Sequence, residues 1–344
     1  MNPYLLSLIL GIVEGLTEFL PVSSTAHLRI TEALLGHWSG NPGILEDGYW
    51  KMYTIVIQLG AILCLPIYFR KRILKFLGTF PRGESGNRTI LTHPLTLTLI
   101  AFLVTAIPAW RLTKLIGKNL ESLYVMGSAL LIGGVVMWIV DVLFGWIPRA
   151  QPAAVRSGAA VAATVNAGPV PSGLSGNGEF SEPESPVAPG RHPVLATTPR
   201  MEDMKWWQAV WIGACQILSA VFPGTSRSMS TIAAGQVAGM SRPAALEFSF
   251  FLSIPTMIVA TGYDFLKTVV LKKGAPGETL PPIHMDPQRW IVLAIGFAVS
   301  FVVAWAVVAW FMNWVRRRGF APFAFYRIIV GAAVLIWAFK VAGA

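Results

Sequence analysis

Two carboxylates, a run of hydroxyls and an imidazole interrupt an otherwise apolar stretch near the N-terminus. From Gly11 to His27 the chain reads GIVEGLTEFLPVSSTAH. Glu14 and Glu18 are four residues apart, so they share one face of a helix. Because a carboxylate at membrane depth costs about 2.5–3.5 kcal/mol on insertion scales, two on one face indicate a polar pocket. There they could hold a metal ion, handle protons or do both; the alternative is an interfacial helix on which both are solvated.

The hydroxyls follow a helix break. Pro21 ends the first helix, and Ser23, Ser24 and Thr25 are candidate N-caps of a second helix that carries His27. Ser24 and His27 are three residues apart and would share a face of that helix. A hydroxyl beside an imidazole could form an activated nucleophile or an acid–base relay. The alternative is a pair of ordinary capping residues and a structural histidine.

A second motif, FPGTSRSMST, occupies 222–231 between two apolar runs. Its Pro-Gly pair predicts a turn, and the small hydroxyl residues predict the start of a helix, whose free N–H groups and dipole favour an anion. Arg227 adds a guanidinium suited to bidentate phosphate binding, although it could instead point into a loop. The candidate substrate contacts are Ser23, Thr25, Gly224, Thr225, Ser226, Ser228 and Thr231.

Composition is typical of a membrane protein. The 344 residues are 54% hydrophobic and 13% charged, with a mean hydropathy of +0.59, whereas soluble domains carry about 25% charged residues. The net charge of +10 is better explained by loop anchors than by nucleic-acid binding. No cleavable signal peptide is expected, because the N-terminus lacks a basic region. Cys64 and Cys215 lie in apolar runs and are interpreted as buried hydrophobes.

The apolar runs predict an all-α integral membrane protein built from two halves. Residues 1–146 would form a re-entrant helical hairpin over 4–35 and transmembrane helices at about 50–69, 89–110 and 123–146. Residues 205–344 would form a hairpin over 206–240 and transmembrane helices at about 244–271, 288–315 and 321–342. Between them, 147–204 is rich in Ala, Pro, Gly and Ser, which predicts a disordered linker.

The two halves are expected to form an inverted-topology repeat. A hairpin leaves on the side it entered and three spans change sides, so the second half is inverted relative to the first. A shift of 202 residues aligns Gly11 with Gly213, Glu14 with Gln216, Pro21 with Pro223, and Ser24 with Ser226. The loop at 70–88 carries six Lys and Arg residues, the linker four and 316–318 three, against three at 111–118 and two at 272–273; this assigns the first three loops to the cytoplasm and the first hairpin to the outer face.

Together, GIVEGLTEFLPVSSTAH and FPGTSRSMST resemble the two signature motifs of the undecaprenyl-diphosphate phosphatase family, also called the bacitracin-resistance family. The resemblance covers the chain except the linker, which is longer than the family pattern. It implies hydrolysis of a C55 polyprenyl diphosphate to the monophosphate, recycling the lipid carrier of bacterial cell-wall synthesis. The family's catalytic residues match Glu14, Glu18, Ser24, His27 and Arg227. One departure is an alanine, directly before the matched histidine, where glycine is usual.

We therefore expect a bacterial inner-membrane phosphatase whose site opens to the extracytoplasmic side. Arg227 would bind the diphosphate, and Ser24 would be the nucleophile or a phosphate ligand, with His27 as its base or as the nucleophile itself. Glu14 and Glu18 would coordinate Mg²⁺ or Ca²⁺, or shuttle protons. The rival is a transporter or flippase of the same lipid, since inverted repeats are also transporter architecture. The oligomeric state is left open, with a homodimer as one option.

Overall fold

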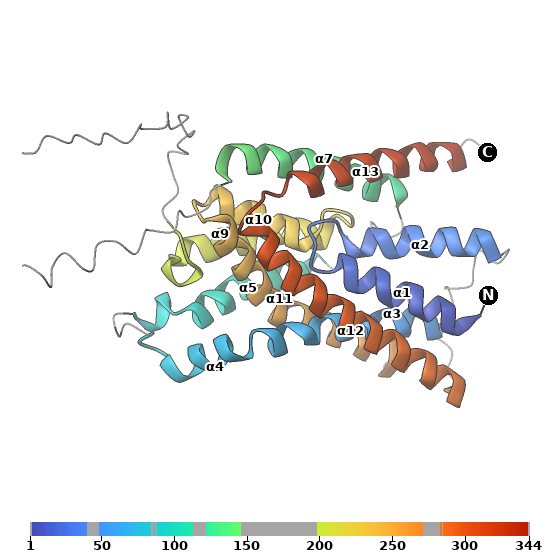
Figure 1. Ribbon diagram of the computed structural model, residues 1–344, viewed down its shortest axis with the longest axis horizontal. Coiled ribbons are helices and arrows are strands. Elements are labelled where there is room, and N and C mark those ends of the chain that lie inside the picture. Colours follow the sequence, from blue (N-terminus) through green and yellow to red (C-terminus); the bar gives the residue numbers. More distant parts are fainter. Residues whose placement is uncertain are drawn as a thin grey trace, which may run out of the picture. The chain divides into compact units, whose positions relative to one another are not determined.

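The structure, a computed structural model, describes residues 2–39, 48–83, 86, 88–112, 122–145, 198–270, 283 and 285–342. These residues form helices joined by turns (Figure 1), and a single isolated β-bridge links Thr198 to Met240 within them. The predicted all-α class is therefore confirmed for this part of the chain.

Six helices among the described residues are long and apolar enough to cross a bilayer. They are α3 (Gly48–Tyr68), α5 (Pro94–Arg111), α7 (Leu123–Phe144), α11 (Arg242–Phe265), α12 (Pro287–Val315) and α13 (Ala321–Ala342). Each overlaps one predicted transmembrane segment. The largest differences are local: α5 starts later than predicted because a 3₁₀ turn, Ile90–Thr92, precedes it, and α11 ends earlier where a π-helical turn, Leu266–Val270, begins.

Four shorter helices form two pairs, and each pair is broken at a proline. The first pair is α1 (Pro3–Thr17) and α2 (Ser24–Ser39), and the second is α9 (Trp206–Val221) and α10 (Arg227–Val237). Pro21 and Pro223 lie in the breaks, because proline cannot continue a helix without losing a hydrogen bond. Each second helix follows a serine in the left-handed region, Ser23 with φ 76° and Ser226 with φ 71°.

The short helices pack closely against long ones. α1 lies against α12 and α9 against α5, while α7 and α13 run along each other (Figure 1). A Cβ atom at Gly11 would lie 2.9 Å from the carbonyl oxygen of Gly296, and one at Gly213 would lie 2.4 Å from that of Ala101. Both crossings therefore require glycine, as is common where membrane helices approach closely. They hold the two broken pairs between the long helices.

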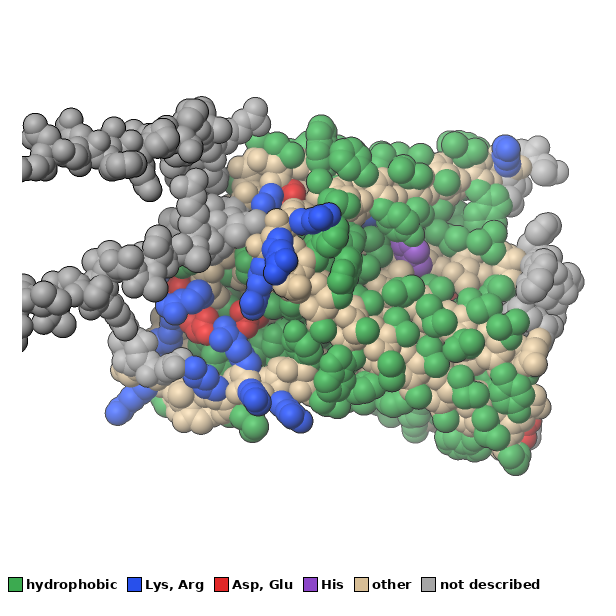
Figure 2. Space-filling view, viewed as in Figure 1, with side chains coloured by type: hydrophobic (Ala, Val, Ile, Leu, Met, Phe, Trp, Pro, Cys, Tyr) green, Lys and Arg blue, Asp and Glu red, His purple; other side chains and the backbone are tan. Residues whose placement is uncertain are grey.

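Basic side chains gather at one end of the visible face, whereas the rest of that face is mostly hydrophobic (Figure 2). Part of this end is α4 (Arg70–Thr79), a helix that buries Phe76 where the sequence pattern predicts only a loop. Asp141, at the C-terminal end of α7, bonds Arg242 at 2.7 Å and the backbone N–H of Phe320 at 2.8 Å. Because both of its oxygens bond to neighbouring elements, this carboxylate has a structural role.

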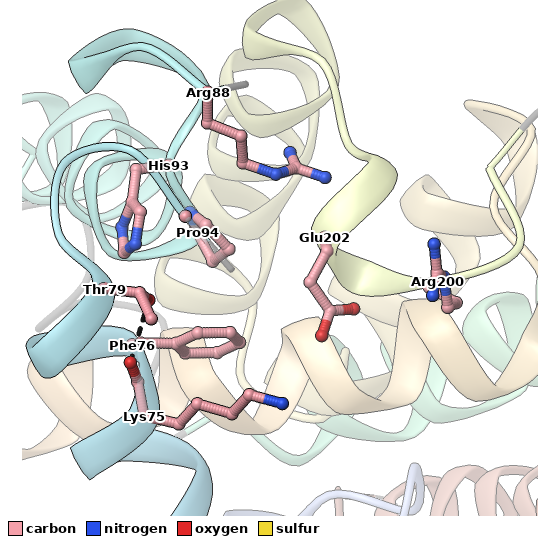
Figure 3. Close-up of a pocket in the computed structure, with 9 residues that line it drawn as sticks. Lys75, Phe76, Thr79, Arg88, His93, Pro94, Arg200 and Glu202 are labelled. Carbon is pink, nitrogen blue, oxygen red and sulfur yellow. Dashed lines mark hydrogen bonds between the residues drawn. The ribbon is translucent and has the colours of Figure 1, made fainter. Parts of the chain in front are cut away.

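The last seven residues of the predicted linker are packed against this end. Met201 is fully buried, and Glu202 bonds Arg72 of α4 at 2.7 Å. Figure 3 shows Glu202 and its basic neighbours around a small pocket at this junction. The boundary predicted at 204 is therefore too late, because burial and ion pairing order residues 198–204. The rest of the predicted linker, from 147 to 197, lies outside the described residues.

Candidate active site

A buried arginine joins the two proline-containing turns. Arg327 of α13 is 0% exposed. Its Nη1 donates to the carbonyl of Pro21 at 3.0 Å, and its Nη2 donates to the carbonyls of Gly224 and Thr225 at 3.0 and 2.9 Å. One guanidinium thus bonds turns that are about two hundred residues apart in sequence, which brings the two predicted motifs together.

The second turn packs tightly against the backbone of α7. Gly224 has φ 96°, and a Cβ atom there would lie 2.5 Å from the carbonyl oxygen of Met126. Glycine is therefore needed both for the backbone conformation and for the close approach to α7. Ser228 donates from Oγ to the carbonyl of Leu20 at 2.9 Å, which adds a second contact between the turns.

Glu18 is the centre of the polar cluster where the turns meet. Ser24 donates from Oγ to Oε2 of Glu18 at 2.6 Å, and Arg227 donates from Nη2 to Oε1 at 3.1 Å. Arg227 also donates from Nη1 to the hydroxyl of Ser253 on α11. The Glu18 and Arg227 side chains are only 4% and 12% exposed. A carboxylate held this way can accept a proton from the serine, and the guanidinium is fixed beside it.

Local structure explains why Ser24 meets Glu18. Glu18 is the C-cap that follows α1, and Ser24 begins α2 after a turn that contains Pro21. Residues 18–22 form the turn, Ser23 leaves it with a positive φ of 76°, and the first residue of α2 then lies within hydrogen-bond distance of the end of α1. The Ser24 hydroxyl is therefore directed to Glu18, whereas the sequence pattern alone pairs it with His27.

Glu14 lies one helical turn before Glu18 and is 0% exposed. Its carboxyl group interacts electrostatically with Glu18 and Arg227. Apart from the Glu18 carboxyl, neither of its oxygens has a hydrogen-bond partner among the described residues. A buried carboxyl without other partners is costly, so this position is suited to a ligand, a cation or a proton.

His27 is held away from Ser24 by two other partners. Its Nδ1 lies 2.7 Å from the carbonyl oxygen of Ser23, and its Nε2 lies 2.7 Å from the hydroxyl of Tyr326 on α13. A carbonyl can only accept, so Nδ1 carries the hydrogen in the neutral ring and Nε2 accepts from the tyrosine. The expected Ser24–His27 hydrogen bond is therefore not among the contacts of this structure.

The remaining predicted substrate contacts lie either at the turns or further along a helix. Ser226 caps α10, and its Oγ lies 3.1 Å from that of Ser228. Thr231 points to α11, where its hydroxyl lies 2.7 Å from that of Ser249, so it joins helices instead of facing the turn. Thr25 is half-buried in the first turn of α2, and Thr225 is half-buried beside the cap of α10. Residues of the turns are thus better placed to reach a substrate than residues one helical turn further along.

Comparison with known protein families gives a match that includes both motifs. The family model described as "Bacitracin resistance protein BacA" matches residues 7–333. The chain belongs to the BacA family. The resemblance inferred from the two motifs is thereby confirmed.

Several relatives of this BacA family chain carry the name undecaprenyl-diphosphatase. The one from Koribacter versatilis is 61% identical over 340 residues, covering 99% of this chain and 100% of the relative. The one from Caldanaerobacter subterraneus is 33% identical, covering 95% and 93%, and the one from Rhizobium etli is 34% identical, covering 96% of each. Similarity therefore extends across both motifs and the helices between them.

Three polar residues of this BacA site were not predicted from the sequence. Ser253 bonds Arg227, Tyr326 bonds His27, and Arg327 bonds both turns. Ser253 follows Ser249 by one helical turn within an apolar span, a spacing that could have marked a polar face. Tyr326 and Arg327 are adjacent in the last span, and the residues around the pair are apolar, so no extended motif marks them.

Proposed function

We propose that this chain hydrolyses undecaprenyl diphosphate to undecaprenyl phosphate and inorganic phosphate at the cluster of Glu18, Ser24 and Arg227. The observation that carries the proposal is that one buried carboxylate accepts hydrogen bonds from a hydroxyl and from a guanidinium at once. This arrangement provides a nucleophile, its base and a phosphate ligand in one place. The activity is the one named for the relatives. Its product is the lipid carrier of cell-wall synthesis, and bacitracin resistance follows from the same activity.

Ser24 is the nucleophile in this proposal, and Glu18 is its base. The Ser24 oxygen bonds the terminal phosphorus, and the bond from that phosphorus to the bridging oxygen breaks, releasing undecaprenyl phosphate with the electron pair. The hydroxyl proton passes to Glu18. Water then attacks the phosphoserine, leaving one of its protons on the released phosphate and passing the other to solvent, while Glu18 returns its proton to the departing serine oxygen. The 2.6 Å contact between Ser24 and Glu18 supports this assignment.

Arg227 stabilises the charge that develops on the transferred phosphoryl group. Two of its nitrogens are held by Glu18 and Ser253, which fixes the plane of the guanidinium. Its Nε has no partner among the described residues although it is buried. That N–H and the first backbone N–H groups of α10 remain for the phosphate oxygens, in surroundings from which water is largely excluded.

His27 is less suited to be the nucleophile. Its Nε2 accepts from Tyr326 and its Nδ1 donates to Ser23, so neither nitrogen is directed at the cluster around Glu18. A phosphohistidine would require Tyr326 to leave Nε2 first. We assign His27 to positioning or to proton transfer with the departing phosphate.

A divalent cation fits the Glu14 position. Among the described residues no group of three or more His, Cys, Asp or Glu side chains could hold a metal ion. Mg²⁺, however, is often bound by one or two carboxylates together with substrate phosphates. Glu14, whose oxygens receive no hydrogen bond from any described residue except the neighbouring Glu18 carboxyl, would hold the ion beside Glu18. Mg²⁺ or Ca²⁺ there would neutralise charge on the diphosphate.

The inverted repeat is supported by reciprocal packing. α1 contacts α12 and α9 contacts α5, α3 contacts α12 and α11 contacts α5, while α7 contacts α13. This is the pattern expected if two halves of five helices each are related by a two-fold axis. Under this proposal the two broken pairs are re-entrant hairpins, tolerated in a membrane because they are enclosed by protein.

The basic end supports a cytoplasmic assignment for α4, residues 198–204 and the α12–α13 loop. α1 and α2 occupy the opposite end of Figure 1 from α9 and α10. The first hairpin would then enter from the extracytoplasmic side of a bacterial inner membrane, which is where we place access to Ser24 and His27.

The test uses purified protein in detergent and undecaprenyl diphosphate labelled in the terminal phosphate. Rapid quenching should trap an acid-stable phosphoserine at Ser24, and Ser24→Ala should be inactive. Glu18→Gln should lower the rate of adduct formation by about 10²- to 10⁴-fold because the general base is lost. Glu32→Gln is the matched control, since Glu32 lies on α2 paired with the exposed Arg29.

Two results would contradict the mechanism. An acid-labile adduct on His27 would make the imidazole the nucleophile. Inversion at phosphorus without any adduct would mean direct attack by water. The detergent assay also separates the enzyme from the transporter alternative, because a transporter alone releases no phosphate in the absence of sealed compartments.

A further inference from the structure

An apolar groove lies between α7, α9 and α10, with a volume of about 680 Å³. That volume is within the range of about 300–1,000 Å³ found for small-molecule sites. Its rim is formed by large side chains that remain exposed, among them Trp211 and Leu218 of α9 and Ile132 of α7, with exposed fractions of 43%, 53% and 59%. The groove is therefore a trough with a bulky apolar rim.

The floor of the groove is made of small residues. Gly133 of α7 and Ala233 and Ala234 of α10 line it. A Cβ atom at Gly133 would lie 2.3 Å from Nη2 of Arg327, so glycine is required where the floor covers the arginine that joins the turns. Small residues below and large ones at the sides leave space for an extended chain.

One part of the groove borders the proposed phosphate-binding turn. Thr225 and Phe222 line it together with Met229 and Ser230 from the first turn of α10. Thr225 directly precedes Ser226, the cap of α10, and Arg227 follows. The groove thus reaches the turn that precedes Arg227, although Arg227, Glu18 and Ser24 are not themselves among its lining residues.

The groove is also long. Its α7 residues run from Tyr124 to Val140, sixteen positions, which corresponds to about 24 Å along a helix. It extends from the level of the turn toward the end of α7 where Asp141 bonds Arg242. A headgroup bound at a turn inside the membrane needs an apolar path of this kind for its hydrocarbon chain.

We propose that this groove binds the first part of the polyprenyl chain of the substrate while the diphosphate lies at the turn. The inference rests on the proposed function, because it takes the diphosphate to be held by Arg227. Chain recognition in the groove makes the enzyme select long isoprenoid diphosphates, since only they fill the trough beyond the turn. It also directs the chain toward the basic end of the protein.

The first test narrows the groove without touching the polar cluster. Val136→Trp adds bulk at a groove residue that is 43% exposed, and Val302→Trp is the matched control at an α12 residue that is 62% exposed and not in the groove. In lipid nanodiscs, Val136→Trp should lower kcat/KM for undecaprenyl diphosphate at least about tenfold and that for farnesyl diphosphate no more than about threefold. Val302→Trp should change neither. Equal losses for the two substrates, or no loss, would overturn the proposal.

The second test locates the chain directly. An undecaprenyl diphosphate analogue with a diazirine in its proximal isoprene units should label peptides of α7 and α10 in the unmodified protein, and Val136→Trp should reduce this labelling several-fold. Labelling confined to α12 or α13 would overturn the proposal. So would equal labelling by a diazirine phosphatidylcholine that undecaprenyl diphosphate does not displace, or cross-links between two copies of the chain through this groove.

A wrong assignment of the groove can be distinguished from a wrong proposed function by comparing two variants. If Arg227 does not bind the diphosphate, Arg227→Ala retains hydrolysis of both substrates. If only the groove assignment is wrong, Arg227→Ala is inactive on both substrates while Val136→Trp leaves the ratio of undecaprenyl to farnesyl turnover unchanged.

Discussion

Replacing Arg327 with methionine should separate the two turns. The side chain is fully buried and bonds three turn carbonyls, those of Pro21, Gly224 and Thr225, at 2.9–3.0 Å. A fourth bond, to Ala129 of α7, is longer at 3.2 Å. With a net contribution of about 1 kcal/mol for each turn carbonyl, Arg327→Met should destabilise the protein by about 3 kcal/mol.

The functional loss should exceed what stability alone predicts. Glu18 follows α1 and Arg227 begins α10, so their 3.1 Å contact depends on how the turns are aligned. We expect kcat to fall at least about tenfold in the folded fraction of Arg327→Met, with a smaller change in KM. Arg327→Lys should recover only part of the loss, because a single ammonium cannot reach carbonyls on both turns in one plane.

The measurement combines reversible unfolding in mixed micelles with steady-state kinetics on undecaprenyl diphosphate. Arg29→Met is the matched control, since the Arg29 side chain is 51% exposed and its pair with Glu32 contributes little. If Arg327→Met and Arg29→Met shift the unfolding free energy equally, by less than about 0.5 kcal/mol, the role given to Arg327 is wrong.

Three further predictions concern separate parts of the chain. Arg227→Lys should lower kcat by about a hundredfold or more, because an ammonium cannot hold Glu18 and a phosphate in one plane; near-normal turnover would argue against a planar contact. Tyr326→Phe should make His27 react several-fold faster with diethyl pyrocarbonate, read by peptide mass spectrometry, since Nε2 loses its donor; an unchanged rate would mean that the hydroxyl does not occupy it. Replacing residues 148–194 with a short Gly/Ser linker should leave turnover within about twofold, because that composition cannot bury a core; inactive but folded protein would assign the segment a role.

Chain-local features were sufficient to predict the six long helices, the two broken pairs and the two motif turns, but not α4. Length and hydropathy determine where α3, α5, α7, α11, α12 and α13 lie, because crossing a bilayer needs about 20 apolar residues. Pro21 and Pro223 determine where the short helices break, because proline removes a backbone donor. The four-residue spacing of Glu14 and Glu18 placed them on one helical face. These are properties of neighbouring residues, so they can be inferred without a fold.

The partners of the site residues depend on tertiary structure. Spacing on a helix pairs Ser24 with His27, but the turn over residues 18–22 brings its hydroxyl to Glu18 instead. His27 bonds Tyr326 of α13, which is 299 residues away in the sequence. Arg227 bonds Ser253 of α11, which is 26 residues away.

Packing likewise determined which polar residues belong to the site and where the linker ends. Arg327 has only Tyr326 as a polar neighbour in its apolar span, yet it bonds both turns because α13 packs along α7 beside them. Residues 198–204 have a linker-like composition, but Met201 is buried and Glu202 pairs with Arg72 of α4. Hydrogen bonds and ion pairs between distant segments follow from how the helices cross, so the pairing of Ser24 with Glu18 and the arginine that joins the turns emerge only in the folded chain.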